Sequence, residues 1–168
     1  MRRAVPLLAA LLVVSLALAP AAGASKPERE VVPAPNAMVF TGQCAFDVLA
    51  RIEGGEIDTT FFDTTGDPVK KIGVFPGQTL TVTNLETGQT ITVLNAGSTQ
   101  ARVKRDGSVE ISIMGHGPLQ NEIVGGEPGL WYLNGGRVVV TIDGEGNLES
   151  VTVRGNVVNL CDRLAPAP

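Results

Sequence analysis

The feature that most constrains this chain is a two-residue alternation of apolar and polar side chains through most of its length. In 79–83 and 90–93, leucine, valine and isoleucine alternate with threonine, and in 44–52 apolar residues occupy every second position. Side chains of a β-strand alternate between the two faces of a sheet, so this period predicts strands with one apolar face. Within 38–163 no stretch has the spacing of an amphipathic helix, and we expect nearly no helix in the mature domain.

Tight turns separate the predicted strands. Thr-Gly and Asp-Gly pairs are typical of antiparallel hairpins, because glycine adopts positive φ at low cost. The predicted turns are Thr87-Gly88, Asp106-Gly107, Asn134-Gly135-Gly136 and 143–147, and 157–161 is predicted as the last strand.

The fold class that follows is all-β, with about ten short antiparallel strands. Strands with one polar face exclude a parallel α/β fold, whose sheet is covered on both sides. The strands can form an up-and-down barrel or, alternatively, a two-sheet sandwich. We favour the barrel, because a link between the first and last strands would bring the ends of a meander together.

The two cysteines supply that link. Cys44 and Cys161 are the only cysteines and lie near opposite ends of the predicted domain. We predict that they form a disulfide, which for so long a loop contributes about 4 to 5 kcal/mol in the chain-entropy model. Two separate buried thiols are the alternative, and they are the less favoured one in an oxidising compartment.

The first 24 residues have the three parts of a secretory signal peptide. Arg2 and Arg3 precede an apolar run over 4–19, and Ala22 and Ala24 place small side chains at a cleavage site. An uncleaved anchor is less favoured, because the run ends before the roughly 20 residues that span a bilayer. We therefore expect a secreted or cell-surface protein, outside the cytoplasm and without a membrane span after cleavage.

Four segments follow from these features. We predict a signal peptide at 1–24, a flexible proline-containing leader at 25–37, one β-domain at 38–163 and a flexible tail at 164–168.

The charge of the mature chain disfavours one class of partner. Without the signal peptide, 11 basic and 17 acidic residues remain, and the longest basic cluster is Arg102, Lys104 and Arg105. Binding to a phosphate backbone requires clustered cations. We expect no nucleic-acid partner.

The inventory of reactive side chains assigns no catalytic residue, metal or cofactor. His116 is the single histidine and lies between two glycines, which predicts a loop position. Asp143, Glu145 and Asn147 resemble the start of a calcium loop, but Arg154 stands where such a loop needs its closing glutamate, so we predict a hairpin turn.

Three acidic residues leave one enzymatic hypothesis open. Asp58, Asp63 and Asp67 surround Phe61-Phe62, and two facing carboxylates could hydrolyse a glycosidic bond. A secreted carboxylate-dependent hydrolase is therefore the alternative function. Solvated acids at strand ends are the commoner arrangement.

Four aromatic residues are the candidates for ligand binding. Adjacent residues of a strand point to opposite faces, so one ring of Phe61-Phe62 and one of Trp131-Tyr132 must face outward or toward a mouth. Ordinary packing is the commoner use of such rings. An exposed ring could stack on a sugar or cover an apolar ligand.

The chain also resembles a group of exported actinobacterial proteins without an assigned activity. The shared features are the signal peptide, an F-x-x-x-C-x-F-x-V start at 40–48, hairpins rich in threonine and glycine, and a D-x-x-x-G-x-x-x-x-x-C end near 151–161. The resemblance implies no activity and no functional residue. The function we expect is a non-enzymatic binding or structural domain for an apolar or glycan ligand, or for a cell-surface component.

Overall fold

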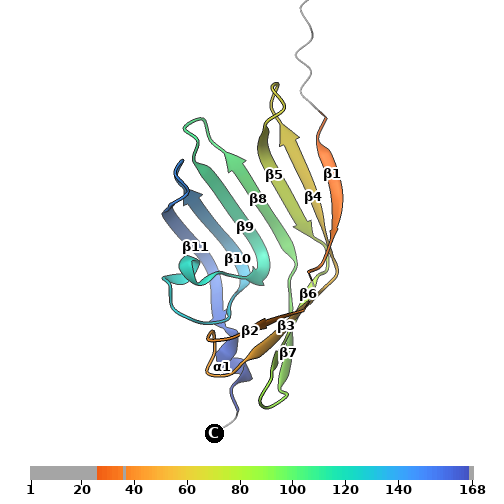
Figure 1. Cartoon of the computed structure of the whole chain (residues 1–168), viewed down its shortest axis with the longest axis vertical. Helices are drawn as coiled ribbons and strands as arrows, with labels where there is room; N and C mark the ends of the chain where they lie inside the picture. Colours follow the sequence, from red (N-terminus) through yellow and green to blue (C-terminus); the bar gives the residue numbers. More distant parts are fainter. Residues whose placement is uncertain (1–25, 36, 167–168) are drawn as a thin grey trace, which may run out of the picture.

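The computed structural model describes residues 26–35 and 37–166, which form two antiparallel sheets (Figure 1). The predicted signal peptide lies outside the described residues. The larger sheet has seven strands, in spatial order β1 (Glu28–Pro33), β4 (Gly55–Phe62), β5 (Pro68–Phe75), β8 (Gly97–Val103), β9 (Val109–Pro118), β10 (Trp131–Ile142) and β11 (Leu148–Asn159). The smaller sheet has the order β2 (Met38–Phe40), β3 (Val48–Glu53), β6 (Thr79–Asn84) and β7 (Thr90–Leu94). Two short helices complete the fold, the 3₁₀ helix η2 (Asn121–Val124) and the helix α1 (Leu160–Leu164). No helix in the described part of the chain is long and apolar enough to cross a membrane.

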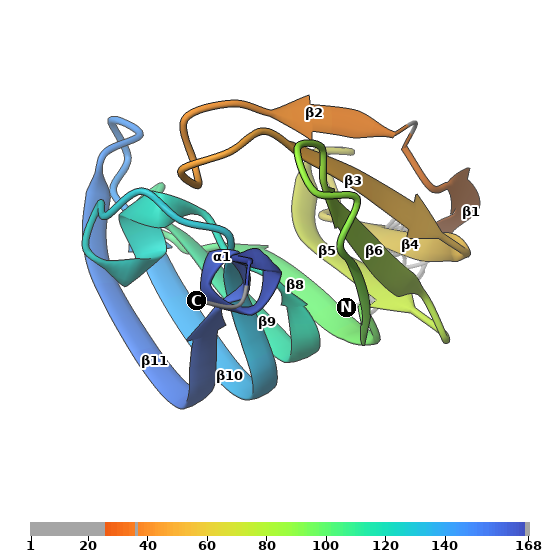
Figure 2. The same cartoon turned by 90° about the horizontal axis from the view of Figure 1, so that it is seen from below.

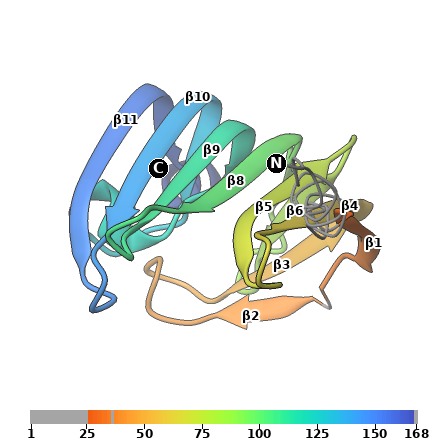
Figure 3. The same ribbon diagram turned by 90° about the horizontal axis from the view of Figure 1, so that it is seen from above.

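The two sheets are halves of one meander that bends between them. The chain passes from β3 to β4 at Gly54, from β5 to β6 through 76–78, and from β7 to β8 through 95–96. Neighbouring strands stay neighbours across these bends, because β3 pairs with β6 where β4 pairs with β5. The large sheet curves strongly, with α1 inside the curve (Figure 2) and the small sheet across its open side (Figure 3).

The all-β prediction is confirmed, and the arrangement is the two-sheet alternative instead of the favoured closed barrel. Within the described residues, the edge strands of the large sheet are β1 and β11, which do not pair with each other. After β11 the chain turns into α1, whose buried Leu160 and Leu164 pack against the small sheet. The last element therefore fills the interior and does not complete a ring of strands.

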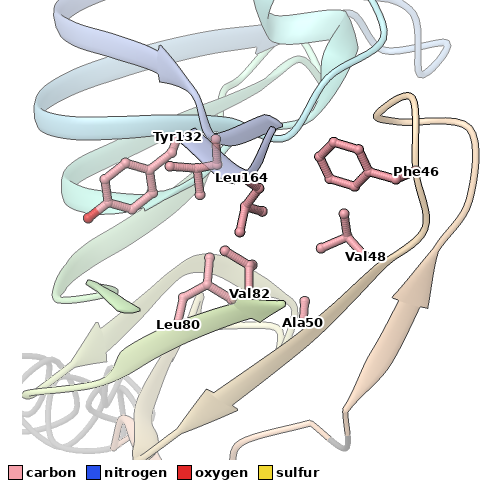
Figure 4. Close-up of a cluster of buried hydrophobic side chains, with 8 residues drawn as sticks. Phe46, Val48, Ala50, Leu80, Val82, Tyr132 and Leu164 are labelled. Atoms are coloured by element: carbon pink, nitrogen blue, oxygen red, sulfur yellow. The ribbon is translucent and has the colours of Figure 1, made fainter. Parts of the chain in front are cut away.

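The main core lies between the sheets. On β6, Leu80 and Val82 are buried while the alternating threonines are only partly covered, as the period predicts. Figure 4 shows this cluster around Leu164 and Tyr132. A second cluster lies on the concave face of the large sheet, where Leu133, Val138 and Val140 pack beneath η2.

The disulfide prediction is confirmed. Cys44 and Cys161 are bonded, and their Cα atoms are 5.5 Å apart. The bond joins the segment before β3 to α1, so the cysteines are not themselves in strands.

The predicted turns at 87–88, 106–107 and 143–147 are present, and the one at 134–136 is not. Strand β10 continues through Gly135 and Gly136, with a register shift against both of its neighbours. Gly136 has a φ of 144°, and a Cβ there would lie 2.7 Å from Gly155 Cα of β11. These glycines therefore do not form a turn. They allow two long strands to pair closely and irregularly, as glycines within strands often do.

The structure also differs from the prediction at both ends of the domain. Residues 28–33, placed in the flexible leader, form β1 on β4, and Leu164, placed in the flexible tail, is fully buried. Strand β1 shows no apolar alternation because the face of β4 beside it is polar: Glu30 lies opposite Asp58. Residues 157–159 of the predicted final strand belong to β11, and helix α1 begins at Leu160. Asn159 caps the helix by accepting a hydrogen bond from Cys161 N at 3.0 Å.

Candidate functional site

A cavity of 460 Å³ opens between the two sheets. Strands β2, β3 and β6 form one wall, and the η2 segment, the start of β10 and the start of α1 form the other. Its apolar lining includes Met38, Phe40, Ile52, Leu119, Trp131 and Leu160. The cavity therefore reaches from the surface toward the main core.

Polar groups at this cavity hold its walls together. Gln43 Oε1 accepts hydrogen bonds from Asn121 Nδ2 at 2.8 Å and from Gly129 N at 3.4 Å. Gln43 precedes Cys44, and its carbonyl oxygen lies 3.5 Å from Sγ of the disulfide-bonded Cys161. The disulfide and this glutamine thus connect the chain before β3 to both α1 and the η2 segment.

Trp131 is the one predicted binding residue that lines this cavity. Its Nε1 donates to the carbonyl of Glu127 at 2.8 Å, and its ring lies against Gly129, where a Cβ would come within 2.9 Å of ring atom Cε2. The ring is half-buried. Because the indole N–H already has a hydrogen-bond partner in the protein, the rest of the ring can form an apolar wall of the cavity.

The other three aromatic candidates lie elsewhere. Tyr132 is buried between the sheets and donates its hydroxyl hydrogen bond to the carbonyl of Leu94, and burial raises the pKa of this tyrosine. Phe61 and Phe62 end β4, and Lys70 Nζ lies 5.5 Å from the centroid of the Phe61 ring. Tyr132 is therefore a core residue, and the two phenylalanines are not brought together with Trp131.

A second cavity of 290 Å³ adjoins the first, and Pro35, Ile52 and Pro118 line both. Its surface is mainly apolar, as in the first cavity, but more of the residues around it are polar. They include the side chains of Glu56, Gln78, Asn95, Thr99 and His116.

His116 is in a strand, and the predicted loop position is wrong. It belongs to β9, lies opposite Asn134 of β10, and its backbone N–H donates to the carbonyl of Ala96 at 2.9 Å. Strand β9 pairs with β8 on one side and with β10 on the other, and this pairing keeps the glycines on either side of His116 in the strand. The ring lines the second cavity, and its Nδ1 is buried without a hydrogen-bond partner among the described residues.

The three aspartates proposed for hydrolysis do not converge. Asp58 is 4% exposed on β4, with its Oδ2 2.6 Å from Lys71 Nζ. Asp63 and Asp67 lie in the β4–β5 turn, where both accept a hydrogen bond from Thr65 Oγ1, at 2.7 Å and 2.9 Å. These hydrogen bonds, with those from backbone N–H groups, lower the pKa of Asp63.

The carboxyl group beside Asp58 is that of Glu56, which sequence reasoning missed. Both side chains converge over Gly73 of β5: a Cβ on Gly73 would clash with Glu56 Oε1 and lie 3.0 Å from Asp58 Oδ1 and 2.9 Å from Thr99 Oγ1. Burial raises the pKa of Glu56, and hydrogen bonding and charge repulsion from Asp58 raise it further, against the opposing effect of Lys71. The available signal was the two-residue spacing of Glu56 and Asp58, which places both side chains on one face of a strand.

The residues that resembled a calcium loop form the predicted hairpin turn. Asp143 Oδ1 accepts hydrogen bonds from the backbone N–H groups of Glu145 at 2.9 Å and Asn147 at 2.8 Å. In the part of the chain that the structure describes, no three histidine, cysteine or acidic side chains gather in a way that could hold a metal ion.

Comparison with known proteins found no match to any family model, curated protein or solved structure. The geometry of the two cavities is therefore the basis for the functional proposal.

Proposed function

We propose that this protein is exported and that its β-domain binds a small, largely apolar molecule in the cavity between the sheets. The observation that carries the proposal is the 460 Å³ cavity with its apolar lining. Ligand sites are typically apolar clefts of about 300 to 1,000 Å³ with a few placed polar groups.

Two features support a cavity that exists before the ligand arrives. The disulfide and the Gln43 hydrogen bonds connect its walls, and Asn84 Nδ2 holds the end of α1 through the carbonyl of Leu164 at 3.0 Å. A preformed site binds its ligand more tightly, because less free energy is lost in ordering the protein when the complex forms.

The export part of the proposal rests on the sequence of 1–24 and on the disulfide. Stable disulfides are typical of oxidising compartments. Mass spectrometry of the secreted protein should find a mature N-terminus directly after Ala24. A product that keeps Met1 would contradict export by a cleaved signal peptide.

Trp131 gives a direct test of binding, because it is the only tryptophan and it lines the cavity. We expect decanol, added to protein freed of bound lipid, to change the tryptophan emission in a saturable way. Native mass spectrometry should show one ligand per chain. An emission that does not respond, with no bound species detected, would contradict the proposal.

Two neighbouring residues of β2 provide a variant and its control. Met38 lines the cavity and is 46% exposed, whereas Val39 does not line it and is 56% exposed. A charge placed in an apolar cavity is costly, so Met38→Glu should weaken decanol binding at least about tenfold. Val39→Glu should leave it unchanged. Equal effects of the two substitutions would argue that binding occurs elsewhere.

A glycan is the other ligand class that the aromatic residues suggested. Sugar recognition needs several hydrogen-bonding groups, and most of the lining of the first cavity is apolar. A panel of simple sugars should therefore cause no emission change. If the protein bound a sugar and did not bind decanol, the proposed ligand class would have to be a glycan and not an apolar molecule.

The hydrolase hypothesis loses the observation on which it rested, because Asp63 and Asp67 are turn residues. Asp58 is paired with Lys71. We therefore propose binding and not hydrolysis as the function of this domain.

A further inference from the structure

The two cavities differ in chemistry and share part of their walls. Pro35, Ile52 and Pro118 line both, so the two cavities are adjacent. The surface of both is mainly apolar, and the second also carries the polar side chains of Glu56 and His116. This arrangement suits a molecule with an apolar chain and a polar head.

Glu56 lines the second cavity, and the charged groups next to it are mainly acidic. Glu56 and Asp58 lie on the same face of β4, and Glu30 of β1 lies opposite Asp58. Lys71 of β5 is the cation of this group and is bound to Asp58. Three carboxyl groups against one ammonium favour a positively charged head group and disfavour an anion.

Two buried acceptors in this region have unused hydrogen-bonding capacity. Asp58 is 4% exposed, and its buried Oδ1 has no donor among the described residues other than the carboxyl group of Glu56. His116 Nδ1 is also buried and has no hydrogen-bond partner among the described residues. Buried polar atoms are costly unless they are paired, so a ligand that donates hydrogen bonds would be stabilised here.

Gly73 lets the acidic side chains of Glu56 and Asp58 lie close against the sheet. Its φ is not in the left-handed region, so the backbone does not require glycine at this position. Any side chain would instead occupy the place where Glu56, Asp58 and Thr99 converge. The glycine thus gathers two carboxyl groups and one hydroxyl group next to the second cavity, which Glu56 and Thr99 line.

We propose that the second cavity receives the primary ammonium head of an amphiphile whose apolar chain lies in the first cavity. An ammonium group brings three donors and a positive charge to a site that offers carboxylate, hydroxyl and imidazole acceptors. A calcium ion would need six to eight oxygen ligands, which is far more than these two carboxylates and one hydroxyl supply. This proposal rests on the binding function proposed above.

Three ligands with the same chain and different heads test it. Decylamine, decanol and decanoate are titrated into the wild-type protein, and Trp131 emission reports binding of each. We expect decylamine to bind about tenfold tighter than decanol and decanoate to bind weakest, because charge-assisted hydrogen bonds are about twice as strong as neutral ones. Equal affinities, or a preference for decanoate, would overturn the ammonium site while leaving the apolar-binding function intact. Failure of all three ligands to bind would overturn both.

A matched pair of substitutions locates the head group. Glu56→Gln should lower decylamine affinity to about that of decanol, with decanol affinity unchanged within twofold, since the charge is lost and the shape is kept. Glu53→Gln, at an exposed position of β3, is the control and should keep the preference for the amine. Retained decanol binding shows that each variant is folded. A Glu56→Gln protein that still prefers decylamine tenfold would overturn the assignment.

Discussion

At the scale of single residues, one buried amide joins three parts of the fold. Asn84 is 0% exposed; its Nδ2 donates to the carbonyl of Leu164 and its Oδ1 accepts from the backbone N–H groups of Glu86 at 2.9 Å and Thr87 at 3.2 Å. The side chain thus shapes the β6–β7 turn and anchors the end of α1. An apolar side chain of this size could do neither.

Asn84→Ala should therefore lower the free energy of unfolding by about 2 to 3 kcal/mol, because it leaves the buried carbonyl of Leu164 and two backbone N–H groups of the β6–β7 turn without their partner. Denaturant unfolding measures this loss. Asn156→Ala, at an exposed position of β11, is the control and should change stability by less than about 0.5 kcal/mol. Similar small losses in both variants would show that the buried amide contributes little.

The raised pKa of Glu56 predicts a pH dependence of stability. The folded protein holds this proton more tightly than the unfolded chain, where the pKa is near the ordinary value of 4.5. The stabilisation is thus complete below that value and is lost as the pH rises through the raised pKa of the folded state. The side chain introduced by Glu56→Gln cannot ionise. We therefore expect the free energy of unfolding of this variant, relative to that of the wild type, to increase with pH in this window.

Unfolding free energies of both proteins across this pH range test the prediction. The comparison removes Glu56 together with its coupling to Asp58 and Lys71, whereas all other titratable groups are the same in both proteins. A constant difference between the two proteins would contradict a raised pKa.

At the scale of elements, the disulfide acts on the smallest one. Helix α1 has only five residues, which is too short to be stable alone, and it is held by Cys161, by its buried leucines and by hydrogen bonds to its last carbonyls. Because Leu160 and Gln43 also line the first cavity, the position of α1 and the shape of the cavity depend on each other.

Replacing both cysteines by serine should lower stability by about 2 to 5 kcal/mol and should also weaken decanol binding. The reason for the second effect is that the walls joined by the bond are then free to move. Denaturant unfolding and Trp131 emission measure the two effects. Lower stability with unchanged affinity would show that the bond supports the fold but does not shape the cavity.

At the scale of the whole molecule, the bends of the meander create the cavity. Each long hairpin arm contributes to both sheets, and the small sheet lies across the concave side of the large one (Figures 2 and 3). The ligand site proposed here is therefore made of segments from both ends of the chain, and it cannot exist in the unfolded state.

Ligand binding should in turn stabilise the whole fold. At a decanol concentration of 100 times the dissociation constant, mass action predicts about 2.7 kcal/mol of added stability. Calorimetry should show a rise in melting temperature for the wild type and Val39→Glu, and little rise for Met38→Glu. A wild-type melting temperature that does not change with ligand would contradict binding to the native state.

The features predicted correctly from the sequence are mainly those that depend on local chemistry. Period two over 79–83 and 90–93 predicted β6 and β7, because one face of each strand must be apolar to cover a core. Thr87-Gly88 and Asp106-Gly107 predicted their turns, since few sequences adopt positive φ as cheaply. Oxidising chemistry and position near the domain ends predicted the single disulfide.

The features that tertiary structure decided are those in which a residue depends on a distant partner. Gly135 and Gly136 serve a turn or an irregular long strand equally well, and the approach of β11 selects the strand. Residues 28–33 have no apolar pattern of their own. They form β1 because β4 offers a free edge with which they can pair. Glu56 and Gly73 are unremarkable until β4 and β5 pair and place a carboxyl group over the glycine. The sequence by itself thus determined the elements and most of their turns, whereas the cavity and its charge arose only when bent strands from distant segments were packed face to face.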